Sequence, residues 1–199
     1  MPDQLTLFDD APAMPPGFEY EAALVSREHE IEILGHVRAL PFREFEFQGY
    51  VGKRRVVSFG WRYDFNDRSL HEAKEMPPFL LPLRDAAARF AQLLPATLQH
   101  VLVTKYAAGA GIGWHRDKGV FDDVIDNSLL SPCALRMRRR VGERWERRSL
   151  RVEPRSVYLF RGEARTDWEH SIPEVEALRY SITFRNLRAS VVASAASSR

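Results

Sequence analysis

The feature that most constrains the fold is a run of short strand-like segments that fills the second half of the chain. Turn-forming residues separate these segments at short intervals, and clear helical patterns are found only before them. Helices followed by many short strands favour an α+β fold, in which N-terminal helices buttress an antiparallel sandwich or a jelly-roll barrel. The segments expected as strands are residues 100–106, 111–117, 133–140, 149–154, 156–162, 169–173 and 179–187.

Two helices are predicted in the first half of the chain. Ser26 is expected to cap the first helix, and acidic residues follow in its first turn. The second helix is predicted over about residues 83–94, with apolar residues at helical spacing, and it ends before Pro95. The apolar stripe of the first helix consists of Ile31, Ile33, Leu34, Val37 and Leu40.

The length of 199 residues and the 45% hydrophobic content suit one sizeable core and are too small for two ordinary domains. We expect one globular domain at residues 17–188, with flexible tails at 1–16 and 189–199. No stretch approaches the roughly eighteen apolar residues of a membrane span, and no secretory signal is recognisable. We therefore expect a cytoplasmic protein, and separately we expect a monomer. The single cysteine, Cys133, leaves nitrogen and oxygen ligands for any metal.

Positive charge is concentrated in one block of a nearly neutral chain. Between Arg136 and Arg155 there are nine arginines against Glu143, Glu146 and Glu153, although the net charge is only +2. Such a block can face the phosphates of a nucleic acid, or it can form the solvated face of charge-rich strands. Both interpretations stay open.

A candidate metal site is formed by two predicted strands. His115 and Asp117 are two residues apart, so on a strand both side chains project from the same face. His170 lies in a later predicted strand. Two histidines and one carboxylate form the facial triad that suits Fe(II) and leaves positions open for O2 and a co-substrate.

A second constellation follows nine residues after His170, in the segment RYSITFR. Read as a strand, it places Arg179, Ser181, Thr183 and Arg185 on one face. Two guanidiniums on an inward face require anions, because a buried unpaired charge is costly. If both side chains lean inward, their heads lie about 7 Å apart, which matches a five-carbon diacid. The alternative is an exposed edge strand.

In this order, HRD (115–117), WEHSIP (168–173) and RYSITFR (179–185) resemble the signature of the AlkB family of Fe(II)/2-oxoglutarate dioxygenases. The segment VTKYAAGAGIGWHRDK is similar to the strands that lead into the metal site of that family. GWRYDF (60–65) and MPPFLLPL (76–83) are similar to its nucleotide-facing lid. The likeness covers about residues 20–188.

The resemblance implies a double-stranded β-helix, the jelly-roll variant, with His115, Asp117 and His170 as iron ligands. It implies that Arg179 and Tyr106 bind the distal carboxylate of 2-oxoglutarate, and that Arg185 serves the carboxylate nearer the metal. The implied reaction uses O2 to demethylate an N-alkylated nucleobase in DNA or RNA, and it releases formaldehyde, succinate and CO2. Thr104, Ser181 and Thr183 complete the expected co-substrate site.

The chain departs from the family pattern at three positions. Ser181 and Thr104 stand where the family has asparagines, and Gly119 replaces an acidic residue that contacts the base in repair enzymes, with Asp122 and Asp123 following. The departure at Gly119 keeps open the same oxygenase chemistry on a protein side chain, a lipid or a small molecule. A non-enzymatic, cupin-like binding domain with structural histidines is a third hypothesis.

Substrate contacts are expected from the lid and from the residue after the HRD motif. Trp61 and Tyr63 can stack on an unpaired base, although packing of a hairpin against the barrel explains them equally well. Arg62 and Lys118 are further candidate substrate-binding residues. Phosphate contacts are expected from Lys53, Arg54 and Arg55.

The N-terminal tail carries a separate motif. Gln4, Leu5, Leu7 and Phe8 lie in a pentapeptide similar to those with which bacterial repair proteins bind the sliding clamp of DNA polymerase. In such a linear motif the apolar side chains enter a hydrophobic pocket and the glutamine forms a hydrogen bond. The alternative is that this apolar patch folds back on the domain.

Overall fold

The computed structural model describes residues 13–47, 50–63, 70–72 and 74–189. Its helices are α1 (Arg27–Val37), α2 (Leu81–Phe90) and α3 (Gly162–Thr166), with short 3-10 turns at Pro78–Leu80 and Pro95–Thr97. Its strands are β1 (Phe18–Glu21), β2 (Arg43–Phe47), β3 (Tyr50–Phe59), β4 (Trp61–Tyr63), β5 (Leu70–Glu72), β6 (His100–Tyr106), β7 (Ile112–His115), β8 (Phe121–Leu129), β9 (Cys133–Val141), β10 (Arg144–Val152), β11 (Val157–Phe160), β12 (Glu169–Ile172) and β13 (Arg179–Leu187).

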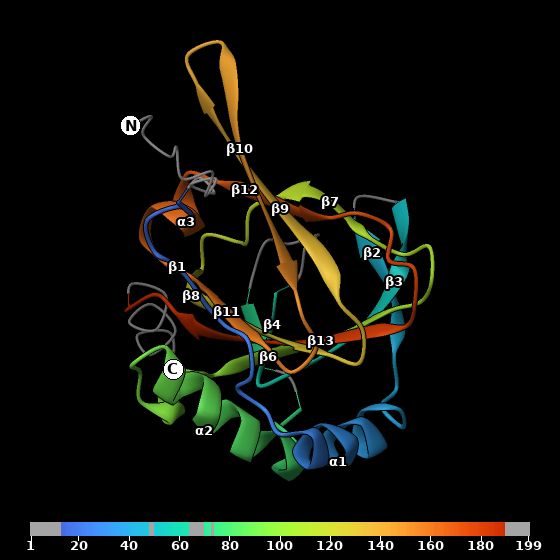
Figure 1. Ribbon diagram of the computed structural model, residues 1–199. Helices are drawn as coiled ribbons and strands as arrows, with labels where there is room; N and C mark the ends of the chain where they lie inside the picture. The colour runs from blue at the N-terminus through green and yellow to red at the C-terminus, as the bar shows by residue number, and fades with distance from the viewer. Residues whose placement is uncertain (1–12, 48–49, 64–69, 73, 190–199) are drawn as a thin grey trace, which may run out of the picture.

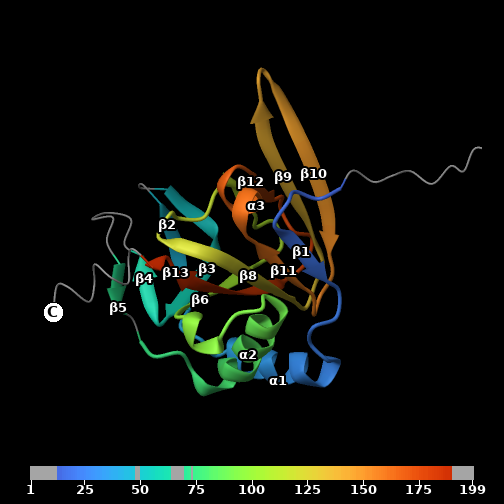
Figure 2. The same cartoon turned by 90° about the vertical axis from the view of Figure 1, so that its left-hand side faces the viewer.

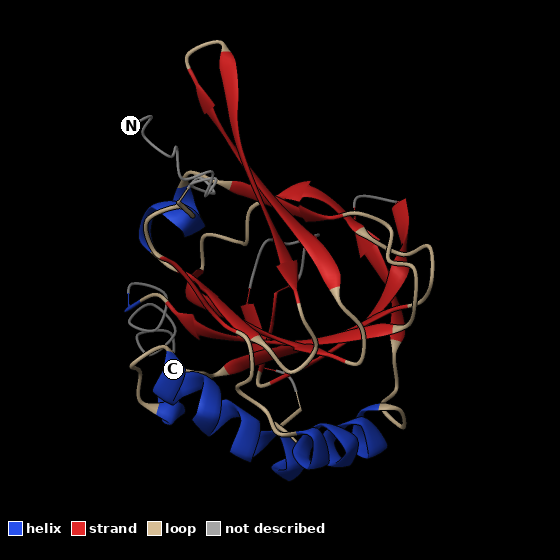
Figure 3. Cartoon of the chain, in the orientation of Figure 1, coloured by secondary structure: helices blue, strands red, loops and turns tan. Residues whose placement is uncertain are grey.

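Two antiparallel sheets face each other and enclose the interior of the molecule (Figures 1 and 3). The larger sheet has seven strands in the order β1-β11-β8-β13-β6-β3-β2, and the smaller one has four in the order β10-β9-β12-β7. Strands β4 and β5 form a separate pair. From β8 onward the chain crosses repeatedly between the two sheets. Strands β8, β11 and β13 lie in the large sheet, and β9, β10 and β12 lie in the small one. This arrangement confirms the jelly-roll core that the sequence predicted.

Helices α1 and α2 cover the outer face of the large sheet (Figure 1). Ile33, Leu34 and Leu83 pack there against apolar residues of the strands, among them Ile182 and Phe184. The opposite face of β13 carries its polar residues, and these point between the sheets, where a second core cluster lies. Burial of the apolar face against helices therefore turns the polar face of β13 toward the interior.

The predicted helices exist, with two corrections. The Ser26 side chain accepts a hydrogen bond from the backbone N–H of His29 at 3.2 Å, as expected for an N-cap. Ile31, however, is 64% exposed, because the buried face of α1 is formed by Ile33, Leu34 and Val37. Helix α2 ends at Phe90, four residues before the predicted end, because Gln92 has a left-handed φ of 55° that stops the helix.

The strands of the second half occur near their predicted places, but β8 was not predicted. Its sequence FDDVIDNSL contains polar residues in the middle, yet almost all of its side chains are buried. The predicted strand 111–117 is also shorter, because β7 ends at His115. The first-half strands β1, β2 and β3 were missed as well. Strands β1 (FEYE) and β2 (REFEF) do alternate acidic and aromatic residues, but they are only four and five residues long, and β3 shows no such alternation.

Strands β9 and β10 form a long hairpin that rises away from the barrel (Figures 1 and 2). They pair in continuous register from Cys133 and Val152 at the base to Val141 and Arg144 at the tip. Gly142 turns the chain there with a φ of 59°. The arginine-rich block of the sequence is therefore a projecting two-stranded ribbon.

Within the described ranges, no helix has the length and apolar character that a bilayer crossing requires. The domain boundaries expected at residues 16 and 188 stay a prediction, because most of both tails lies outside the described residues. The candidate clamp motif of Gln4, Leu5, Leu7 and Phe8 also lies outside them.

Candidate metal centre

The three predicted metal ligands meet at one point inside the barrel. His115 ends β7, Asp117 follows it by two residues, and His170 lies on β12 directly opposite His115 in the strand register. One potential ligand atom from each of the three residues lies within 4.8 Å of those from the other two. Antiparallel pairing of β7 and β12 therefore places two imidazoles and one carboxylate around a single position. This donor set fits Fe(II).

The protonation states of the triad suit a divalent cation. Burial, with a contribution from the neighbouring His115, lowers the pKa of His170 to about 3, and burial also lowers the pKa of His115. Burial of Asp117 opposes its ionisation, but Arg185 and both histidines outweigh this effect and lower its pKa. The site thus holds two neutral imidazoles and an ionised carboxylate near neutral pH. These are the forms that bind metal.

Neighbouring groups orient the ligands. The carbonyl oxygen of Gly113 lies 2.9 Å from Nδ1 of His115, which assigns the proton to Nδ1 and leaves Nε2 free to bind a metal. The ring of His170 stacks on Phe160 at a centroid distance of 4.6 Å. Both imidazoles are therefore held in fixed orientations before any ion binds.

Arg185 holds the carboxylate of the triad. Its Nε and Nη2 atoms lie 3.0 Å and 2.8 Å from Oδ1 of Asp117, and its Nη1 lies 3.4 Å from Nδ1 of the buried His100. The sequence suggested that Arg185 would serve a co-substrate carboxylate. In the structure its guanidinium pairs with Asp117, a candidate metal ligand. A co-substrate carboxylate at the metal would share it with Asp117.

Arg179 is fully buried and has unused hydrogen-bonding capacity. Its Nε donates to the hydroxyl of Ser128 at 3.2 Å, and its guanidinium carbon lies 5.2 Å from the ring centre of Tyr106. Nη1 and Nη2 have no hydrogen-bond partner among the described residues, and the nearest acid, Asp126, is 3.6 Å away. Buried guanidinium nitrogens without partners are costly, so this site is suited to a carboxylate ligand.

The remaining predicted co-substrate residues line the same interior face. In the strand register, Arg179 is opposite Tyr106 and Ser181 is opposite Thr104. All of these side chains are buried. Thr183 donates its hydroxyl hydrogen to Asp126 at 2.7 Å, so this hydroxyl is already engaged.

Three residues near the centre were missed by sequence reasoning, namely His100, Asp126 and Ser128. The two residues of β8 could not be found because that strand was not recognised. Once β8 is aligned with β13, Asp126 lies opposite Thr183 and Ser128 lies opposite Ser181. A run of buried polar residues in an otherwise apolar strand was the available signal, and it can be interpreted only with this pairing.

The expected substrate residues are only partly placed. Trp61 is half-buried at the start of β4, whereas the side chains of Arg62 and Tyr63 lie outside the described part of the chain. Lys118 precedes the turn at Gly119, and its carbonyl oxygen accepts a hydrogen bond from Arg165. Asp123 is buried and paired with Arg161 at 2.7 Å, so it is not available to contact a base.

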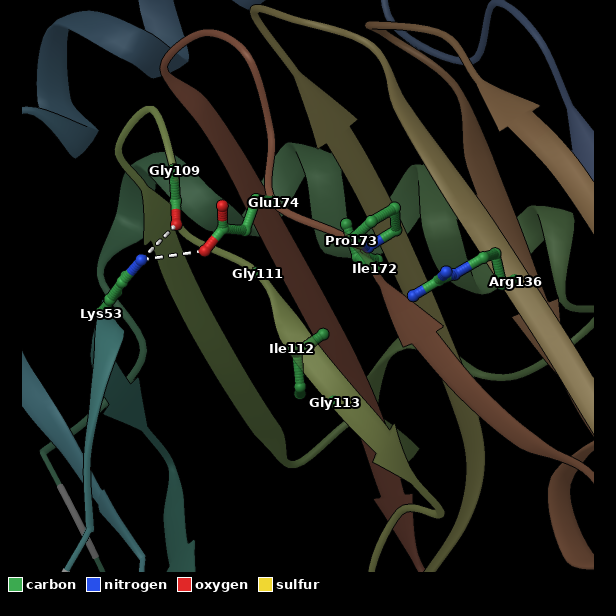
Figure 4. A pocket seen from close by; sticks show the side chains of 9 residues that line it. All are labelled: Lys53, Gly109, Gly111, Ile112, Gly113, Arg136, Ile172, Pro173 and Glu174. Atoms are coloured by element: carbon green, nitrogen blue, oxygen red, sulfur yellow. Dashed lines mark hydrogen bonds and ion pairs between the residues drawn. The ribbon is translucent and has the colours of Figure 1, made fainter.

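The basic residues of β3 were expected to meet phosphates, and all three have contacts within the protein, Arg55 with Glu44 at 3.8 Å. Lys53 pairs with Glu174 at 2.8 Å and donates to the carbonyl of Gly109 at 3.3 Å, at the rim of a hollow of about 430 Å³ (Figure 4). The guanidinium of Arg54 lies 3.8 Å from the ring centre of Phe45. Burial lowers the pKa of Arg54, and Tyr106, Arg185 and Asp117 act on it electrostatically, so it faces the site.

Comparisons with known proteins agree with this geometry. The family model of the 2OG-Fe(II) oxygenase superfamily matches residues 15–185. The alkylated DNA repair protein ALKBH8 homolog of Arabidopsis thaliana is 29% identical over 147 residues, which is 62% of this chain and 42% of that protein. The chain thus spans less than half the length of this relative.

A solved structure, that of OsALKBH1, has the same fold. It superposes with a TM-score of 0.66 at 17% identity, covering 87% of this chain and 98% of that one. The superfamily uses Fe(II), 2-oxoglutarate and O2, and the triad and the buried guanidinium of Arg179 fit the first two. These matches confirm the resemblance to AlkB-type proteins. The chain belongs to the 2OG-Fe(II) oxygenase superfamily.

Proposed function

We propose that the protein is a cytoplasmic, monomeric oxidative demethylase of N-alkylated nucleobases in DNA, with RNA as a further substrate. It consumes 2-oxoglutarate and O2 and releases formaldehyde, succinate and CO2. The observation that carries the proposal is the convergence of His115, Asp117 and His170 inside a barrel that also holds the buried guanidinium of Arg179, whose Nη1 and Nη2 have no hydrogen-bond partner among the described residues. The similarity to an alkylated DNA repair protein supports the substrate class.

Each group has a defined part in this proposal. His115, Asp117 and His170 hold Fe(II), and Arg179 with Tyr106 binds the distal carboxylate of 2-oxoglutarate. When bound, Fe(II) supplies the activation of O2 and the oxidation of the N-methyl carbon. The protein contributes position and electrostatics. Arg185 fixes Asp117, and the Gly113 carbonyl fixes the tautomer of His115.

The hairpin supports a nucleic-acid substrate. One face of its two strands carries Arg136, Arg138, Arg140, Arg147 and Arg151, because these residues alternate with the side chains that face inward. Two of the five pair with carboxylates, Arg138 with Glu169 and Arg151 with Glu153. For the other three, no acidic partner lies within 4.0 Å among the described residues. Phosphates of a bound strand can neutralise them.

The base of this ribbon adjoins the metal ligands. Trp114 immediately precedes His115, and the guanidinium of Arg138 lies 4.3 Å from the Trp114 ring centre and 4.2 Å from that of Trp145. Arg116, between two of the ligands, lines a hollow of about 540 Å³ together with Arg139 and Arg140. Because Trp114 and Arg138 alternate with His115 and Met137, this basic surface lies on the outer face of the small sheet, opposite to the metal ligands. We propose that a strand with a base at the metal passes Arg116 to reach it.

A second candidate keeps the oxygenase chemistry but acts on a protein side chain, a lipid or a small molecule. Gly119 replaces the acid expected to contact a base, and the pairing of Asp123 with Arg161 removes one nearby substitute. Asp122 remains exposed. The glycine at position 119 and the pairing of Asp123 favour the second candidate, whereas the exposed Asp122 stays available for a base.

The test is an activity screen with Fe(II), 2-oxoglutarate and O2, in which formaldehyde and succinate are both measured. Methylated single-stranded DNA, methylated RNA and a methylated peptide are compared. We expect turnover with the oligonucleotides and its loss in His115→Ala and Asp117→Ala, with the helix variant His29→Ala as a control. Turnover only with the peptide would establish the second candidate, and turnover that persists in His115→Ala would reject the ligand assignment.

The N-terminal motif allows a separate proposal. We infer that Gln4, Leu5, Leu7 and Phe8 bind a sliding clamp, which would bring the enzyme to DNA. Binding of the full chain to a bacterial clamp, compared with a Leu7→Ala/Phe8→Ala variant, tests it. Equal affinities would exclude this role.

A further inference from the structure

An acidic side chain lies inside the barrel, next to the proposed co-substrate site. Asp126 is on β8 and is 7% exposed. In the register of the large sheet it lies between Tyr158 on β11 and Thr183 on β13. Its carboxyl group therefore points to the interior, on the same face as Arg179. The functional assignments above leave this acid unexplained.

The contacts of Asp126 are incomplete. Oδ2 accepts a hydrogen bond from the hydroxyl of Thr183 at 2.7 Å. Oδ1 has no hydrogen-bond partner among the described residues and lies 3.6 Å from Nη2 of Arg179, which also lacks one. Three buried polar atoms with unused capacity, including Nη1 of Arg179, thus lie close together. Buried groups in this state are rare because each unmade hydrogen bond is costly.

Among the groups that face Asp126, only one cation is not already paired with another carboxylate. The groups that face it are Arg179 and Arg185 on β13, Tyr106 on β6, Tyr158 on β11 and Cys133 on β9. Arg185 already pairs with Asp117. Burial raises the pKa values of Tyr106, Tyr158 and Cys133, so all three are neutral near pH 7. Arg179 is therefore the cation that balances Asp126.

A dicarboxylate co-substrate brings a second anion to the same guanidinium. With Asp126 ionised, two carboxylates would face one buried cation at short range. Like charges at such a distance do not both stay ionised, and one of the two sites takes up a proton. Burial already raises the pKa of Asp126 above its ordinary value, against the opposing attraction of Arg179. Asp126 is thus the acid that protonates more easily.

We propose that Asp126 takes up one proton from solvent when the distal carboxylate of the co-substrate binds beside Arg179. The neutral carboxylic acid then donates a hydrogen bond to the bound carboxylate, and Arg179 forms the ion pair. This inference rests on the proposed function only for the identity of the co-substrate as 2-oxoglutarate. It makes Asp126 a co-substrate-binding residue and couples co-substrate affinity to pH.

The proposal is tested by calorimetry of 2-oxoglutarate binding to Fe(II)-loaded protein without O2, in buffers of different ionisation enthalpy at one pH. The dependence of the observed heat on the buffer gives the number of protons taken up. We expect a value approaching one near pH 7.5. The Kd should rise about tenfold per pH unit wherever Asp126 is ionised in the free protein.

Asp126→Asn removes the titrating group but keeps its size, and we expect it to bind 2-oxoglutarate with no proton uptake and with a Kd independent of pH. Asp126→Ser provides a second variant in case the amide disturbs the fold. Asp122→Asn, an exposed acid on the same strand, should behave as the wild type.

The outcomes separate this inference from the proposed function. Binding without proton uptake in the wild type would overturn it, and so would undiminished uptake in Asp126→Asn, which would point to another group such as His100. Neither result depends on demethylation. Absence of any 2-oxoglutarate binding would instead reject the proposed function, and this inference with it.

Discussion

Gly111 tests whether the pairing of β7 with β12 sets the geometry of the metal site. It immediately precedes β7, and a Cβ at this position would lie 2.7 Å from the carbonyl oxygen of Ile172 and 2.9 Å from the carbonyl carbon of Pro173. Side-chain carbons do not come so close to backbone atoms, so in Gly111→Ala the segment after β12 must move by several tenths of an ångström. Overpacking of this kind costs about 1–3 kcal/mol.

The same movement changes the distance between the two imidazoles. His115 and His170 are directly opposite across β7 and β12, and metal–ligand distances tolerate changes of only about 0.2 Å. We expect Gly111→Ala to lower the free energy of unfolding by about 1–3 kcal/mol. We also expect it to weaken binding of Fe(II) or Co(II) by about 10-fold to 100-fold, comparable to the loss of a residue that orients a ligand.

The matched control is Gly113→Ala, two residues closer to His115. A Cβ at Gly113 meets nothing within 4 Å, and the substitution keeps the carbonyl that contacts His115. Urea unfolding and an anaerobic metal titration of both variants give the answer. If both variants bind metal as tightly as the wild type, the strand pairing does not control the ligand geometry and the reasoning is refuted.

Three further outcomes are expected. Arg179→Met should raise the KM for 2-oxoglutarate by about 30-fold or more, because a charged hydrogen-bonding partner of a buried carboxylate is lost, while Fe(II) binding is retained; an unchanged KM in steady-state assays would contradict the assignment. Asp123→Asn should reduce the free energy of unfolding by about 1–3 kcal/mol with turnover retained, since Asp123 pairs with Arg161 and does not face the substrate; a stable but inactive variant would argue for a substrate role. The metal-free protein should lose stability as the pH falls below about 6.5, because the folded state keeps His170, with its pKa of about 3, neutral while the unfolded state binds the proton. From pH 7.5 to 5 this contribution is about 2 kcal/mol, and His170→Asn should show a smaller decrease in pH-dependent denaturant titrations.

The sequence predicted the candidate ligands and the two arginines better than it predicted the contacts that hold them in place. HRD, the distal histidine and the alternating arginines are local patterns, and strand alternation alone indicated that their side chains share a face. The structure brings the three candidate ligands together and places Arg185 against Asp117. The contact between Arg185 and Asp117 was not predicted. It depends on how β13 and the segment after β7 lie relative to each other, which no local pattern encodes.

Strand β8 shows why the rest could not be predicted. Its middle residues Asp126, Asn127 and Ser128 have the composition of a turn, yet all are buried. They are compatible with a central strand only because β13 and β11 supply partners on both sides, as in the hydrogen bond from Asn127 to the carbonyl of Ile182 at 3.0 Å. Polar residues are buried only when distant segments satisfy them, and a sequence window contains no such information.

The chain by itself thus determined the class of fold, the candidate metal ligands and the basic character of residues 136–155, since each follows from residue type and spacing. The tertiary structure alone decided that β12 aligns His170 with His115, that Asp126 lies beside the guanidinium of Arg179, and that the basic block projects from the barrel as a hairpin. The physical reason is the same in each case. Residue chemistry is a local property, whereas the strand register and burial that bring charges together arise only from pairing between remote segments.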